Sequence, residues 1–210
     1  MSDEGVEPEV IAPIVPGVAR ALSPLLRRIA LDVGGTAGPN TYLIGIDEIV
    51  VVDPGPDMAD HLDALAGCCG DRLRWIVSTG AADASGAAAL AKRSGAEILG
   101  VPGVGPTKGE QLEFGDTILG TEFRLTVMPA PGIGVARVCF LLEEERVLLS
   151  GDWLPVADDT TPVERPEVVD AAAYAAGVDG LRRKRLRGIA PVIGHLVEDT
   201  KGAIEAAASA

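Results

Sequence analysis

Short apolar runs, separated by turns rich in glycine and proline, dominate the first hundred residues. Strands are predicted at residues 25–31, 40–45, 48–53, 75–78 and 96–100. Helices are predicted at 58–65 and 85–94, and Gly95 provides a typical cap at the end of the second. The glycine-rich stretch 34–39 is expected to be a loop. This half of the chain therefore alternates strands and helices.

The pattern changes after residue 110, where apolar runs follow one another across short polar turns. Strands are predicted within 112–119 and at 123–128, 135–142 and 147–150 as an antiparallel block, because apolar and polar positions alternate. Two helices at 167–176 and 178–187, a strand at 188–193 and a terminal helix complete the prediction. Mixed elements of this kind indicate an α/β protein with helices outside two sheets.

The length and composition favour a single domain. A chain of 210 residues with 47% hydrophobic residues can bury a real core, although aromatic residues make up only 3%. We expect one domain over residues 21–210. Residues 1–20 form an N-terminal segment, part of which is expected to be disordered.

The charge balance argues against nucleic acid and against anionic membranes as partners. The chain has 31 acidic and 18 basic residues and a net charge of −13, which repels phosphate backbones. One basic cluster, Arg182 to Arg185 with Arg187, is a local exception, and a solvated helix face is its favoured interpretation. No apolar run is long enough to cross a bilayer.

The cellular location is predicted from the N-terminus and the cysteines. The first ten residues are acidic and lack the apolar core of a signal peptide. The chain has three cysteines, of which Cys68 and Cys69 are adjacent, so they do not describe a disulfide framework. We therefore expect a reduced, cytoplasmic protein.

Polar residues able to bind metal stand where the predicted strands end. Asp53, Asp152 and His195 follow predicted strands, and Asp83 lies in a turn between a strand and a helix. Strand ends converge at the sites of α/β folds, and two carboxylates with one imidazole suit a divalent ion. Each residue also has a structural interpretation: Asp83 as a helix cap, Asp53 and Asp152 as turn residues, and His195 as a hydrogen-bonded surface histidine.

Six segments in order resemble the motifs of the metallo-β-lactamase fold, in the branch of lactamase-beta-2-like and glyoxalase-II-like hydrolases. They are NTYLIG (40–45), VVDPGP (51–56), IVSTGAADASGAAAL (76–90), MPAPGIGVARVCFLL (128–142), LLSGD (148–152) and PVIGHLV (191–197). The resemblance covers roughly residues 25–200 and implies a four-layer αββα sandwich.

The same resemblance implies a degenerate metal site. The corresponding motifs of the family are THxHxDH, PGHT, GD and PGHG, and their histidines and aspartates hold two zinc ions. Histidine is replaced here at four of these positions, which hold Thr79, Ala81, Ala84 and Ile133. The resemblance leaves Asp83, Asp152 and His195 as metal ligands. The chain has one other histidine, His61, which is predicted to lie on the surface of a helix.

A catalytic zinc needs three protein ligands and an open position, so the loss of histidines favours a non-catalytic pseudo-hydrolase with a binding or structural role. The alternative is a hydrolase of esters or thioesters that uses a residual mononuclear site or a non-metal nucleophile. Its candidate helpers are Asp83, Asp152, His195, Thr79 and Ser85. A nuclease is a third, less favoured function, because the chain is acidic. No catalytic residue is assigned.

Cofactor and partner expectations follow from this hypothesis. We expect no cofactor, and one zinc, iron or manganese ion at Asp83, Asp152 and His195 is the alternative. Without metal, Asp83 and Asp152 would accept hydrogen bonds from loop N–H groups or from His195. The partner is a small molecule or a protein, and association into a homo-oligomer is left open.

Overall fold

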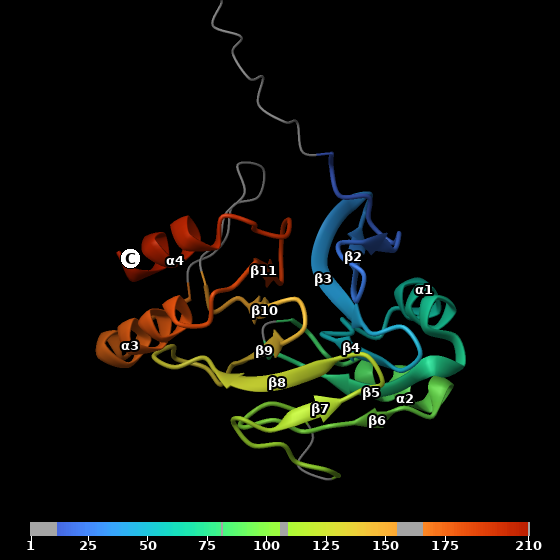
Figure 1. The fold of residues 1–210 in the computed structure, drawn as a ribbon. Coiled ribbons are helices and arrows are strands. Elements are labelled where there is room, and N and C mark those ends of the chain that lie inside the picture. Colours follow the sequence, from blue (N-terminus) through green and yellow to red (C-terminus); the bar gives the residue numbers. More distant parts are fainter. Residues whose placement is uncertain (1–11, 81, 106–108, 155–165, 210) are drawn as a thin grey trace, which may run out of the picture.

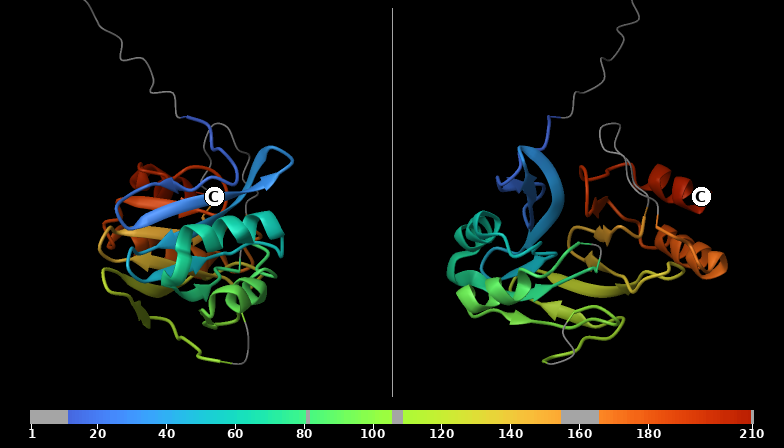
Figure 2. Two further views of the ribbon diagram at one scale, coloured as in Figure 1. Left: turned by 90° about the vertical axis from the view of Figure 1, so that its right-hand side faces the viewer. Right: turned by 180° about the vertical axis from the view of Figure 1, so that it is seen from behind.

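Two β-sheets face each other in the computed structural model, and a pair of helices covers the outer side of each (Figures 1 and 2). The structure describes residues 12–80, 82–105, 109–154 and 166–209. The expected α/β fold with four layers, αββα, is confirmed. In these ranges, no helix is both long enough and apolar enough to span a membrane.

The first sheet comes from the N-terminal half, in the order β1-β2-β3-β4-β5-β6. Its strands are β1 (Arg20–Ala21), β2 (Leu26–Val33), β3 (Thr36–Ile44), β4 (Ile49–Val52), β5 (Leu73–Val77) and β6 (Glu97–Ile98). β4, β5 and β6 run parallel, and the chain crosses between them through α1 (Ala59–Cys69), with a 3-10 turn at Gly70–Arg72, and α2 (Ala87–Ser94). The carboxyl ends of these parallel strands therefore share one edge of the sheet.

The second sheet comes from the C-terminal half, in the order β11-β10-β9-β8-β7. Its strands are β7 (Thr117–Leu119), β8 (Arg124–Pro129), β9 (Val138–Leu142), β10 (Val147–Gly151) and β11 (Gly188–Pro191). The antiparallel block is confirmed for β7 to β10, and β11 pairs parallel to β10. The helices α3 (Ala171–Arg182) and α4 (Thr200–Ala208) cover its outer face (Figure 1).

The core between the sheets is aliphatic, as the composition predicts. Alternate residues of both sheets meet there, including Leu26, Val50, Val52, Val127, Phe140 and Leu149. Separate clusters bury the inner faces of α1 and α2 and of α3 and α4. Trp153 anchors the last of these clusters, where its ring is 1% exposed and meets Tyr174 edge to face.

Two sequence predictions are wrong in detail. The loop predicted at 34–39 is a tight turn at Gly34 and Gly35, after which β3 already begins at Thr36. Both glycines have positive φ, so the two long strands join directly and pair over most of their length.

The two helices predicted at 167–176 and 178–187 are one helix, α3, which ends at Arg182. Gly177 lies inside α3 and does not break it. A Cβ at Gly177 would lie 2.6 Å from the Cγ of Pro131 and 2.9 Å from the Cζ2 of Trp153. The glycine therefore allows α3 to approach these rings, at a cost in helix propensity that packing offsets.

Candidate functional site

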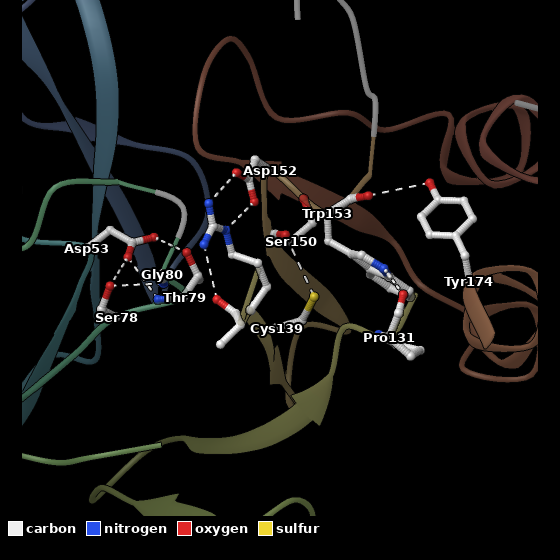
Figure 3. A network of polar contacts seen from close by, with 12 residues as sticks. Asp53, Ser78, Thr79, Gly80, Pro131, Cys139, Ser150, Asp152, Trp153 and Tyr174 are labelled. Atoms are coloured by element: carbon white, nitrogen blue, oxygen red, sulfur yellow. Dashed lines mark hydrogen bonds and ion pairs between the residues drawn. The ribbon is translucent and has the colours of Figure 1, made fainter. Parts of the chain in front are cut away.

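The candidate site lies where the carboxyl ends of β4, β5 and β10 approach one another across the two sheets (Figure 3). The backbone N–H of Val138, at the start of β9, donates to the carbonyl of Thr79 at 3.1 Å. This bond ties the loop after β5 to the second sheet. The residues at these strand ends are therefore held in one polar region.

Asp53 is the best-satisfied carboxylate of this region. It follows β4, is 2% exposed and accepts three hydrogen bonds from the loop after β5 (Figure 3). The hydroxyl of Ser78 donates to Oδ1 at 2.8 Å, the backbone N–H of Thr79 donates to Oδ1 at 2.8 Å, and the Thr79 hydroxyl donates to Oδ2 at 2.7 Å. Asp53 is thus a buried hydrogen-bond acceptor that holds the loop after β5, in addition to being a turn residue.

Burial raises the pKa of Asp53 above its ordinary value, and the bonds from Thr79 and Ser78 oppose that shift. The negative charge of Asp152 raises the pKa further, as a smaller contribution. The backbone at Asp53 is left-handed, with φ 55°, which aspartate and asparagine tolerate better than other non-glycine residues. The DPG motif therefore sets a strained turn that aims the carboxylate at the next strand.

Asp152, after β10, pairs with Arg137, which stands just before β9. The Nε of Arg137 donates to Oδ1 of Asp152 at 2.8 Å, and Nη2 donates to Oδ2 at 3.1 Å. The two side chains are 18% and 29% exposed. Both carboxylate oxygens thus face a planar guanidinium, which is the strongest geometry for this kind of pair.

Asp83 and His195 occupy different surroundings. Asp83 is exposed, and its Oδ1 accepts from the backbone N–H of Ser85 at 2.8 Å, so it caps its own turn before α2. His195 is half-buried after Gly194. Asp83 therefore has a local hydrogen-bonding role, but the interpretation of Asp83 as a helix cap is wrong, because the N-cap of α2 is Gly86 and this cap has no side-chain hydrogen bond.

The described side chains do not fit a metal centre of the kind the fold implies. In the four described ranges, no three His, Cys, Asp or Glu residues gather into a group that could hold a metal ion. Both oxygens of Asp152 face the guanidinium of Arg137. Ala81, one of the replaced positions, lies outside the described residues. Metal binding by Asp83, Asp152 and His195 stays a prediction.

The prediction that His61 is a surface residue is wrong. His61 is 4% exposed because α1 turns it inward beneath the turn at Gly55, whose Cβ position would lie 3.3 Å from the ring. Its Nε2 lies 3.0 Å from the hydroxyl of Thr41, which itself donates to the Asp53 carbonyl at 2.6 Å. Since that carbonyl only accepts, Nε2 must carry the proton toward Thr41. Burial lowers the pKa of His61.

The other replaced positions lie in three different surroundings. Ala84 lines a small cavity of about 270 Å³ with Pro54, Ser78 and Ser85 among others. Ile133 packs against the core cluster beneath α3 and α4 and forms an isolated bridge with Val168. Thr79, 1% exposed, belongs to the Asp53 network. Each of these three side chains therefore has a role that a histidine would disturb.

The loop that carries His195 is fixed by residues that the sequence did not single out. The Nδ2 of Asn40 donates to the carbonyls of Pro191 at 3.0 Å and Gly194 at 2.9 Å, and the Tyr42 hydroxyl donates to Pro191 at 2.6 Å. Asn40 and Tyr42 are buried on β3, so they join the two sheets at this end. In the sequence, Asn40 and Tyr42 carry no signal beyond their place in the NTYLIG segment.

No protein-family model matches the chain, and no curated protein matches it. Solved structures similar to it include a peroxy diiron species of the chemotaxis sensor ODP, with TM-score 0.69, 20% identity and 92% of this chain and 95% of that chain covered. A metallo-β-lactamase family protein from Thermus thermophilus has TM-score 0.69, 18% identity and coverages of 90% and 80%. ETHE1 from Myxococcus xanthus has TM-score 0.63, 16% identity and coverages of 81% and 80%.

These similarities show the fold. The chain has the metallo-β-lactamase fold, which confirms the fold that the six segments imply. These similarities do not show what the side chains at the strand ends do. The function of this chain is therefore inferred from its own residues there.

Proposed function

We propose that this chain is a non-catalytic protein of the metallo-β-lactamase fold, in which the ion pair of Arg137 and Asp152 stands in the place of a metal centre. The observation that carries the proposal is the two-bonded contact between that guanidinium and both oxygens of Asp152. A metal ion at these strand ends would balance the charge of Asp152. Here the positive guanidinium of Arg137 balances it through two parallel hydrogen bonds.

The nucleophiles near the site support the same proposal. The hydroxyls of Ser78 and Thr79 both donate to Asp53, and the two residues are only 8% and 1% exposed, so both hydroxyls are buried and engaged in holding that carboxylate. The hydroxyl of Thr41 is 1% exposed, and the proton on His61 Nε2 prevents that nitrogen from acting as its base. Burial raises the pKa of the Cys139 thiol, which disfavours the thiolate.

Without catalysis, the function that this fold can still perform is to bind a ligand or a partner. The cavity beside Ala84 is almost wholly apolar, with Ile76, Val77, Ile98 and Leu99 among its walls. It lies at the carboxyl ends of the parallel strands, where α/β folds bind ligands. We therefore expect this edge to hold a small apolar group or a partner side chain without transforming it.

We expect the purified chain to hydrolyse neither a β-lactam nor a glutathione thioester at a rate typical of enzymes, which is on the order of 1 per second or more. The assay uses a chromogenic cephalosporin and S-lactoylglutathione, with added zinc, iron or manganese and with a chelator.

Turnover that a chelator abolishes would contradict the proposal and establish a residual metal site. Turnover that survives the chelator would contradict it in favour of a non-metal nucleophile. Asp152→Asn distinguishes turnover by this chain from turnover by a contaminating enzyme. Activity that belongs to the chain would change in this variant, whereas activity of a contaminant would not.

A further inference from the structure

A groove lies between the end of α3 and the start of α4, on the outer side of the second sheet and away from the candidate site. Its volume is about 340 Å³. It is lined by Leu181, Arg182, Arg185, Leu186, Thr200, Lys201, Ile204 and Glu205. None of these residues belongs to the strand-end networks, so the groove needs an explanation of its own.

The groove combines an apolar floor with a basic rim. Leu181 and Ile204 are 3% and 5% exposed and belong to the core cluster under α3 and α4. Arg182, Arg185 and Lys201 stand around them as exposed side chains. The long stems of such residues can cover apolar surface while their charged ends stay at the opening.

The charge of the groove is opposite to that of the chain as a whole. Its lining contains three basic residues and one acidic residue, Glu205, whereas the chain carries a net charge of −13. The sequence favoured a solvated helix face for the basic cluster of Arg182 to Arg185 with Arg187. In the structure, members of this cluster have different surroundings. Arg182 and Arg185 line the groove, and Arg183 points to an ion pair with Asp179 at 3.7 Å.

We propose that this groove binds an amphiphilic anion, with a carboxylate or phosphate head at the basic rim and an apolar tail over Leu181, Leu186 and Ile204. Guanidinium groups hold both kinds of head through paired hydrogen bonds. The ion pair of Arg182 with Asp179, at 3.4 Å, is exposed and screened by solvent, so it competes weakly.

The composition of the lining favours this ligand over nucleic acid. Binding of a single strand relies on aromatic stacking and on a basic track along the backbone. Among the lining residues that the structure describes, none is aromatic and three are cations around an apolar floor. A short amphiphile matches both halves of this surface.

Isothermal titration calorimetry of the full chain with octanoate and with octyl phosphate tests the proposal, with octanol and inorganic phosphate as matched single-feature probes. Arg185→Gln and Lys201→Gln are each expected to weaken the binding of octanoate or octyl phosphate about fivefold, the effect of one partly exposed charge. Lys184→Gln removes the same charge from an exposed side chain that does not line the groove, and it should change the affinity less than about twofold. Binding should also weaken as salt is added.

The proposal is supported if either amphiphile binds more tightly than octanol and inorganic phosphate and the groove variants weaken it selectively. The preferred head group then identifies a fatty carboxylate or an alkyl phosphate as the source. Equal binding of octanol, equal loss in Lys184→Gln, or no heat from either amphiphile at millimolar concentration would overturn it. Circular dichroism confirms that each surface variant is folded, so a loss of binding is interpretable.

Discussion

Asp53→Ala is expected to destabilise the chain by about 3 kcal/mol or more, because three donors lose their acceptor together. Ser78 and Thr79 are 8% and 1% exposed, so water does not readily replace the carboxylate. Alanine also tolerates the left-handed backbone at φ 55° poorly. Urea denaturation of the two proteins at pH 7 measures the difference in the free energy of unfolding.

Asp53→Asn is the matched control for this prediction. The amide oxygen can accept from the N–H of Thr79 and the hydroxyl of Ser78, its NH₂ can donate to the rotated hydroxyl of Thr79, and asparagine suits the left-handed backbone. We expect Asp53→Asn to be much more stable than Asp53→Ala. An asparagine variant as unstable as the alanine variant would contradict the hydrogen-bonding role.

The pH dependence of Asp53 has a definite sign. Burial raises its pKa in the folded state above the ordinary value of 3.8, so folding favours the protonated form. The contribution of Asp53 to the free energy of unfolding is therefore greatest below pH 3.8 and falls as the pH rises toward the folded pKa. Asp53→Asn should remove this decline, which the difference between the two denaturation series against pH would show.

Arg137→Ala is expected to cost about 1 to 2 kcal/mol of stability, since it leaves Asp152 without its partner in a partly buried place. A double-mutant cycle with Asp152→Asn isolates the pairwise energy, which we expect to be about 1 kcal/mol. Arg137→Lys keeps the charge and loses the fork of parallel donors, so it should recover only part of the loss.

The exposed pair of Arg124 and Glu144 provides a control inside the same chain. Its Nε to Oε1 distance is 2.9 Å, close to that of the site pair, but the arginine side chain is 62% exposed. A cycle on this pair should give a clearly smaller coupling energy than the cycle on Arg137 and Asp152, because solvent screens the exposed charges. Equal coupling energies in the two cycles would show that Arg137 and Asp152 form an ordinary surface contact.

Much of the fold could be predicted from local sequence patterns. The parallel strand β4 reads as a continuous apolar run, IVVV, because both of its faces are covered. The prediction failed where long-range packing decides the outcome. Gly177 normally indicates a helix break, but contacts with Pro131 and Trp153 keep it within α3.

The candidate site was predictable in position and only partly in chemistry. The ends of β4 and β10 were located through Asp53 and Asp152, whose motifs have local signals. Arg137 has none, since its partner lies 15 residues away on another strand end. His61 was misplaced because its burial depends on how α1 packs beneath the turn at Gly55.

The metal content of the chain tests the replacement of a metal centre by Arg137 most directly. The protein would be purified after growth with added zinc, iron and manganese, dialysed without chelator and measured by elemental analysis. We expect well below one ion of any of these metals per chain, in the wild type and in Asp152→Asn alike. About one ion or more per chain in the wild type, lost in Asp152→Asn, would contradict this interpretation and establish a metal site at the ends of the strands.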